Sequence, residues 1–138
     1  MQPASESPDR RATGPVPRAW EQVLDREALG RLRELDPSGQ GGLVDRVLAT
    51  YAQSLAKLMA QLGAARAAAD LQGLRHVAHT LKSSSASVGA LQLSALCADI
   101  ERMVRENQTD GLEARLDAMA DEGGRVLAAL SPNPSTAP

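Results

Sequence analysis

The chain of 138 residues contains no phenylalanine, a single tryptophan, Trp20, and a single tyrosine, Tyr51. Its single cysteine, Cys97, excludes an intramolecular disulfide and falls short of any cysteine-based metal motif. The formal net charge is −2, so the chain has neither a basic surface nor the aromatic platform on which nucleic-acid binding depends. We therefore expect no nucleic-acid partner.

Long apolar runs are also missing. No run approaches the ~18 residues of a transmembrane helix, and the N-terminus lacks the charged and then apolar pattern of a signal peptide. We therefore expect a cytoplasmic protein without a membrane partner. A chain of this length is large enough for one hydrophobic core and too small for two.

The two ends of the chain are polar and interrupted by proline. Residues 1–20 and 131–138 have too little apolar surface to offset the entropy of ordering them, and we predict that both are disordered tails or linkers. Residues 21–130 remain as a single folded domain.

Within this domain every segment predicts helix. Asp25 is a predicted N-cap, with Leu24 and Leu29 placed to pack together across the helix start, and Asp36-Pro37 ends this short first helix. Asp70 is the N-cap of a later helix that ends at Gly89.

Four longer segments have apolar residues at spacings of three and four, the pattern of amphipathic helices. Short connections between them favour antiparallel neighbours. We therefore predict an all-α fold, an antiparallel up-down-up-down four-helix bundle with the short additional N-terminal helix across one end, and a monomer. The four apolar stripes are Val44, Val47, Leu48, Tyr51, Leu55, Leu58, Met59 and Leu62; Leu74, Val77, Leu81 and Val88; Leu93, Leu96, Cys97, Ile100, Met103 and Val104; and Leu112, Leu116, Met119, Val126, Leu127 and Leu130.

The only two histidines, His76 and His79, lie on the helix that ends at Gly89. At about 100° per residue, His79 falls opposite the apolar stripe, on an outward face. An ordinary solvated histidine would satisfy this pattern. However, two cations on the same face favour a neutral, nucleophilic imidazole and would hold an anion beside it. The residues within about 60° of His79 are Gln72, Arg75, His76, Lys82, Ser83 and Ala86.

The run AHTLKSSSASVGALQLSALCADIE, from Ala78 to Glu101, closely resembles the histidine-containing phosphotransfer domains of bacterial multistep two-component signalling. The shared motif is a histidine, an apolar residue two positions later, a lysine three later, small residues, and a glycine ten later. The resemblance implies that His79 accepts a phosphoryl group from the phosphoaspartate of a receiver domain and passes it to another receiver. It also implies that Lys82 lies beside the phosphate.

The resemblance further implies a phosphoryl carrier and not an ATP-using kinase, whose partners are response-regulator receiver domains or a hybrid sensor histidine kinase. We expect no cofactor of its own, with Mg²⁺ on the partner receiver. The expected docking face comprises Gln72, Arg75, Ser83 and Ala86. Ser83 departs from the glycine that the family often has there, and Gly89 is interpreted as structural.

Two alternatives remain at this point. One is a helical module that binds receivers without phosphotransfer, and the other is a metal-binding bundle that uses His76 and His79. We assign no metal site, because a transition metal usually needs three or four ligands and no further histidine exists. His76 is interpreted as a solvated bystander and Cys97 as a small core residue. Asp99 and Glu101 are interpreted as helix-surface carboxylates.

Overall fold

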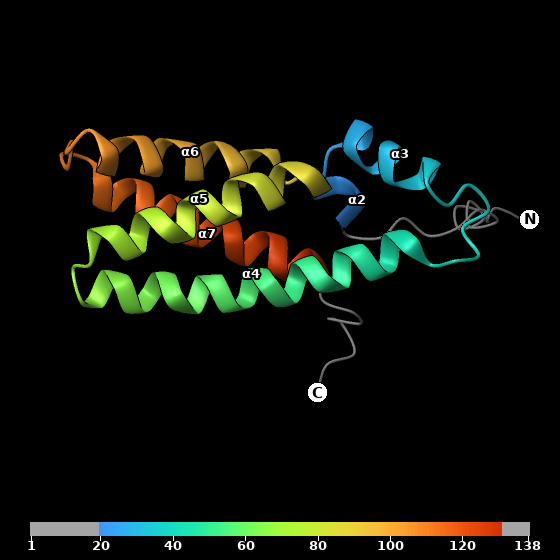
Figure 1. Ribbon diagram of the computed structural model, residues 1–138, viewed down its shortest axis with the longest axis horizontal. Coiled ribbons are helices and arrows are strands. Elements are labelled where there is room, and N and C mark those ends of the chain that lie inside the picture. Colours follow the sequence, from blue (N-terminus) through green and yellow to red (C-terminus); the bar gives the residue numbers. More distant parts are fainter. Residues whose placement is uncertain (1–19, 131–138) are drawn as a thin grey trace, which may run out of the picture.

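The computed structural model describes residues 20–130, which form six helices and no strand. The predicted tails, 1–20 and 131–138, therefore lie outside the described residues except for Trp20. Helices α4, α5, α6 and α7 are long, whereas α2 and α3 are short (Figure 1). Their bounds are α2 Trp20–Val23, α3 Arg26–Glu34, α4 Leu43–Ala67, α5 Leu71–Val88, α6 Leu91–Arg105 and α7 Leu112–Leu130.

The four long helices form a bundle in which each helix runs antiparallel to the one before it (Figure 1). Helices α5 and α6 are joined by only two residues, Gly89 and Ala90, so they must turn back on each other at once. Helix α7 returns to pack against α4, which closes the four helices around one core. The prediction of an all-α helical bundle is confirmed.

The predicted apolar stripes supply most of the core, although Val44, Val47 and Leu96 are among stripe residues that are only partly buried. Leu55, Leu81, Leu93 and Leu116, one from each long helix, are all completely buried. Cys97 is buried as well, and this burial raises the pKa of its thiol to about 12, as expected for a packing residue and not for a reactive thiol.

One buried polar contact joins α4 to α5. The Tyr51 hydroxyl lies 2.7 Å from the Ser85 hydroxyl, and both side chains are inside the core. Burial raises the pKa of Tyr51 to about 12, so the phenol stays neutral and the two hydroxyls satisfy each other. The serine run that follows His79 therefore contributes one member to the core.

The helix that carries both histidines begins and ends as predicted. The Asp70 side chain accepts a hydrogen bond from the backbone N–H of Gly73 at 3.0 Å, which caps α5. At the other end Gly89 has a φ of +90°, a left-handed conformation that glycine adopts without strain. The position of α5 along the bundle is thus defined at both ends.

Helix α3 lies against the turn between α5 and α6. Asp25 caps α3 by accepting from the N–H of Ala28 at 3.1 Å, and its own N–H donates to the carbonyl of Gly89 at 2.8 Å. A Cβ at Gly89 would lie 2.7 Å from the Asp25 nitrogen, so only glycine permits this contact. Helix α2, which the sequence did not predict, packs against α7, and its first residue, Trp20, is a member of the core.

Candidate functional site

Helix α5 presents His79 at the surface. The residues of its inner face, Leu74, Val77 and Leu81, are buried, and the side chain of His79 on the opposite face is 65 % exposed. The helical repeat alone accounts for this placement, because His79 lies two residues from both Val77 and Leu81 and therefore on the far side of the helix. Among residues 20–130, no side chain closes off the ring from solvent.

A buried carboxylate on α6 lies directly beside His79. Glu101 Oε2 is 2.7 Å from His79 Nδ1, and Glu101 Oε1 accepts a hydrogen bond from Lys82 Nζ at 2.7 Å. The side chain of Glu101 is only 8 % exposed. The hydrogen bond from Lys82 and then that from His79 lower the pKa of Glu101, so this carboxylate is ionised at neutral pH.

The ionised carboxylate determines which ring nitrogen of His79 is reactive. A carboxylate can only accept hydrogen bonds, so the proton of a neutral His79 ring must be on Nδ1, where it donates to Glu101. Nε2 then has no proton and keeps its lone pair. The arrangement therefore provides an exposed nitrogen nucleophile whose tautomer is fixed by its neighbour.

Glu101 is buried, so its interpretation from the sequence as a helix-surface carboxylate is wrong. The signal was present in the sequence, since Glu101 lies four residues after Cys97 and three before Val104, both members of the α6 apolar stripe. A charged residue at such a position is partly buried and needs a partner. The sequence does not show that the partners are on α5.

The two cations predicted to flank His79, Lys82 and Arg75, differ in their partners. Lys82 Nζ is engaged by Glu101, and the Lys82 side chain is 38 % exposed. The side chain of Arg75 makes no hydrogen bond or ion pair with any of the residues that the structure describes, and Arg75 is partly exposed. A surface pocket of about 280 Å³ lies beside it, and this pocket is lined by Gln72, Arg75, His76, His79 and Glu101.

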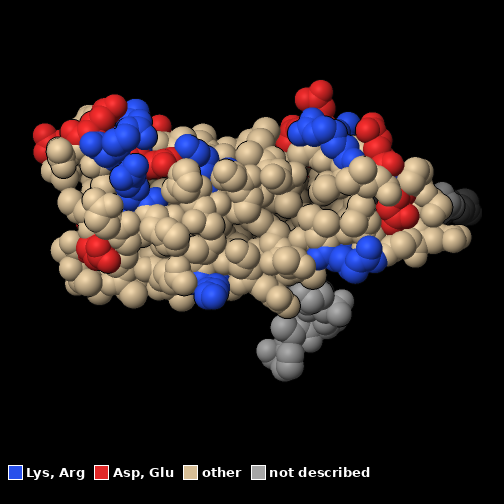
Figure 2. Space-filling model, in the orientation of Figure 1, with Lys and Arg blue, Asp and Glu red and all other residues tan. Residues whose placement is uncertain are grey.

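The remaining predicted docking residues, Ser83 and Ala86, are exposed on the other side of His79. They belong to a stretch, residues 83–98, that contains no charged residue. Figure 2 shows the consequence: Lys, Arg, Asp and Glu gather toward the C-terminal end of α6 and again over α3, with an uncharged area between them. Leu91, at the start of α6, is 50 % exposed within this uncharged stretch.

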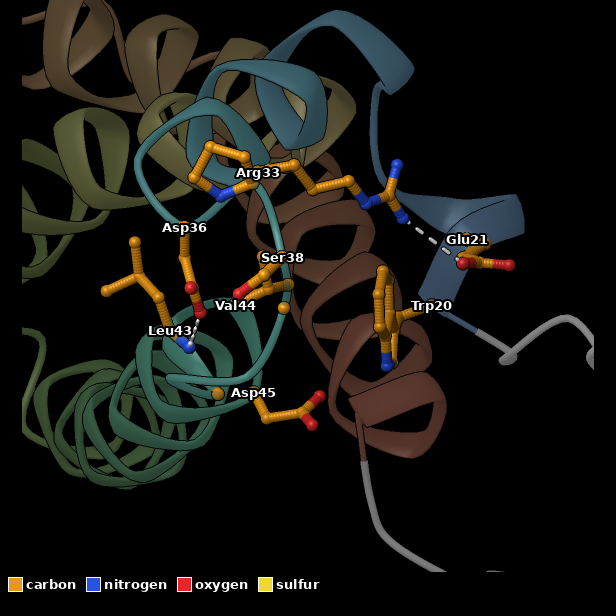
Figure 3. Close-up of a pocket in the computed structure, with 11 residues that line it drawn as sticks. Trp20, Glu21, Arg33, Asp36, Ser38, Leu43, Val44 and Asp45 are labelled. Carbon is orange, nitrogen blue, oxygen red and sulfur yellow. Dashed lines mark hydrogen bonds and ion pairs between the residues drawn. The ribbon is translucent and has the colours of Figure 1, made fainter.

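A second pocket, of about 300 Å³, lies where α2, the α3–α4 connection and α4 meet (Figure 3). Its polar groups have structural tasks. Asp36 accepts hydrogen bonds from the backbone N–H groups of Gly41 and Leu43, which caps the start of α4, and Arg33 pairs with Glu21 at 3.2 Å. This pocket contains no histidine or cysteine.

Among residues 20–130, no three or more His, Cys, Asp or Glu side chains are grouped so that they could hold a metal ion. The metal-binding alternative therefore has no third ligand in this part of the chain. Of the helices that the structure describes, none has the length and apolar character needed to cross a membrane.

Comparisons with known proteins agree on one kind of protein. A family model described as the Hpt domain matches residues 46–130. The crystal structure of histidine-containing phosphotransfer protein B (HptB) from Pseudomonas aeruginosa PAO1 is similar, with a TM-score of 0.68 and 26 % sequence identity over 84 % of this chain and 97 % of that one. No match was found among curated proteins.

Proposed function

Because the chain belongs to the Hpt domain family, we propose that His79 is the residue on which it carries a phosphoryl group. The observation that supports this proposal best is the contact between His79 Nδ1 and Glu101, which leaves Nε2 unprotonated on a ring whose side chain is largely exposed. The source of the phosphoryl group is the phosphoaspartate of a receiver domain, and its destination is a second receiver. The protein is a carrier in a phosphorelay and does not use ATP.

The transfer is a displacement at phosphorus. The lone pair of His79 Nε2 forms the new N–P bond while the P–O bond to the receiver aspartate breaks, and the electron pair of that bond returns to the aspartate as a carboxylate. The Nδ1 proton stays on the ring, so the phosphorylated imidazole carries a positive charge. The ionised Glu101 stabilises this charge through the hydrogen bond that already exists.

The partner is expected to dock on the uncharged surface that includes Ser83 and Ala86. An active site that approaches His79 along this side meets small side chains, and the half-exposed Leu91 supplies apolar contact area. We expect Mg²⁺ to be held by the receiver and not by this chain. The monomeric state and the cytoplasmic location remain predictions.

The experiment that tests the proposal compares two histidines one helical turn apart. Purified wild-type protein, His79→Gln and His76→Gln are incubated with a panel of phosphorylated receiver domains, and acid-labile phosphate on each protein is measured. We expect wild type and His76→Gln to take up the phosphoryl group and His79→Gln to take up none. Lys82→Ala should take it up about 10- to 100-fold more slowly, because a partly exposed charge pair falls in the lower half of the ~1–4 kcal/mol range for close charges.

Circular dichroism serves as the control that each variant keeps its helices. Uptake by His79→Gln at the wild-type rate would defeat the assignment of the site. Absence of uptake by the wild type, with receivers bound at the same face, would instead favour a binding module that does not transfer phosphate.

A further inference from the structure

We propose that Arg75 binds the phosphoryl group once it is on His79, and so acts as a second phosphate-binding residue besides Lys82. This inference rests on the proposed function of His79 and assigns a task to a residue that the family motif does not include. It concerns the phosphorylated protein itself and does not depend on a docked receiver.

The first argument is the engagement of Lys82. Both oxygens of Glu101 are occupied, one by His79 and one by Lys82, so part of the positive charge of Lys82 is already neutralised at 2.7 Å. A phosphoryl group on Nε2 brings a charge of about −1.5 to −2. Lys82 and the ring together do not balance this charge fully, because both are shared with Glu101.

The second argument is the position of Arg75. It lies four residues before His79 on α5, and helical side chains lean toward the N-terminal end, so the His79 ring extends over the turn that holds Arg75. Arg75 and His79 line the same pocket of about 280 Å³, which is large enough for a phosphoryl group. Glu101 holds Nδ1, so Nε2 is the ring nitrogen left to bond to a phosphoryl group.

The third argument is chemical. The Arg75 side chain has no ion pair or hydrogen bond with the described residues, so none of these contacts must break before the side chain turns to a new anion. A guanidinium group presents parallel N–H donors that match two phosphoryl oxygens. Gln72 and His76, which line the same pocket, add further side-chain N–H donors at its edge.

The test is the protonation equilibrium of the phosphoryl group, which a cation in contact with it must shift. All proteins carry His76→Gln, so that no second imidazole in the pocket titrates. They are phosphorylated with phosphoramidate, whose P–N bond breaks as the bond to Nε2 forms and ammonia leaves, or by a receiver from the panel. The ³¹P chemical shift is then followed against pH for proteins with Arg75, Arg75→Gln and Arg75→Lys.

If Arg75 contacts the dianion, Arg75→Gln should raise the pH midpoint by about 0.7 unit, a fivefold change in proton affinity that corresponds to unit charges about 4 Å apart in water. Arg75→Lys should keep most of the effect. Arg31→Gln is the matched control, because it removes the same charge from an exposed residue of α3 outside the pocket.

If the phosphoryl titration midpoint of Arg75→Gln equals that of the His76→Gln protein with Arg75 intact, the inference is overturned, while His79 remains the carrier. A change in the rate of transfer from the receiver, with no change in midpoint, would likewise overturn it and assign Arg75 to docking alone. If neither phosphoramidate nor a phosphorylated receiver phosphorylates the protein with His79 and Arg75 intact, the proposed function itself fails and the inference fails with it.

Discussion

The carboxylate of Glu101 accepts hydrogen bonds from two side chains that the helical repeat places on the surface of α5. One of these bonds selects the tautomer of His79, and the other holds Lys82 within reach of the same ring. Glu101 therefore acts through His79, as a positioning residue that also balances the charge of the phosphorylated ring. Its task resembles that of carboxylates that orient a catalytic histidine in other sites.

We predict that Glu101→Gln slows phosphoryl uptake by about 10- to 100-fold, because a charge-assisted hydrogen bond of about 1.5–3 kcal/mol is replaced by a weaker one. The amide can also donate to Nδ1, which would move the ring proton to Nε2 and block the nucleophile. Initial rates with one phosphorylated receiver measure the effect. Asp99→Asn is the control, since Asp99 also lies on α6 and pairs with Arg102 and Arg115 instead of His79. Equal rates for Glu101→Gln and wild type would contradict this role.

At the scale of elements, the site depends on how α5 and α6 are held relative to each other. His79 and Glu101 are 22 residues apart in the chain and meet because the two-residue turn at Gly89 and Ala90 brings the helices together in one register. The carbonyl of Gly89 in this turn accepts a hydrogen bond from the N–H of Asp25, so the start of α3 also holds the turn in place. A change at this turn is expected to affect both stability and the distance between the two side chains.

We predict opposite effects of alanine at two glycines. Gly63→Ala should raise the free energy of unfolding by about 1 kcal/mol, because Gly63 lies inside α4 and a Cβ there meets nothing within 4 Å. Gly89→Ala should lower it by about 2 kcal/mol or more, because φ is +90° and the new Cβ would lie 2.7 Å from the Asp25 nitrogen. Urea unfolding followed by circular dichroism measures both values. A stabilised Gly89→Ala protein would show that α3 does not pack on this turn.

On the scale of the whole molecule, one apolar core closed by four helices carries the stability, and the polar site lies outside it. The site adds a contribution that depends on pH. The pKa of Glu101 is lower in the folded protein than the ~4.3 of an unfolded chain, so the folded state binds the proton of this group less tightly. Its contribution to stability is therefore complete above the unfolded value and is lost as the pH falls through the folded value.

We predict that wild type is more stable than Glu101→Gln by about 2 kcal/mol at pH 5–7, and that this difference shrinks as the pH falls below about 4. Every other acidic residue is present in both proteins, so the difference reports the replacement of Glu101 and of its contacts with His79 and Lys82. Urea unfolding at several pH values between 3 and 7 gives the curve. A difference that is constant across this range would mean that Glu101 gains nothing from its charge in the folded protein.

Much of this molecule could be predicted from its sequence, because the relevant physics is local. The spacing of Leu74, Val77 and Leu81 places them on one face of α5, which is buried. His79 therefore points outward, whatever the helix packs against. The caps at Asp70 and Gly89 follow from the hydrogen-bonding needs of helix ends and from the backbone freedom of glycine.

Only the tertiary structure decided what His79 touches. The rotation and register of α6 against α5 arise from the packing of the whole core, and they bring Glu101 to the Nδ1 edge of the ring. They also decide that Lys82 is engaged and that Arg75 is left without an ion pair among the described residues. A helical repeat gives the direction of each side chain around its own axis, but contacts between helices depend on distances that no single repeat contains.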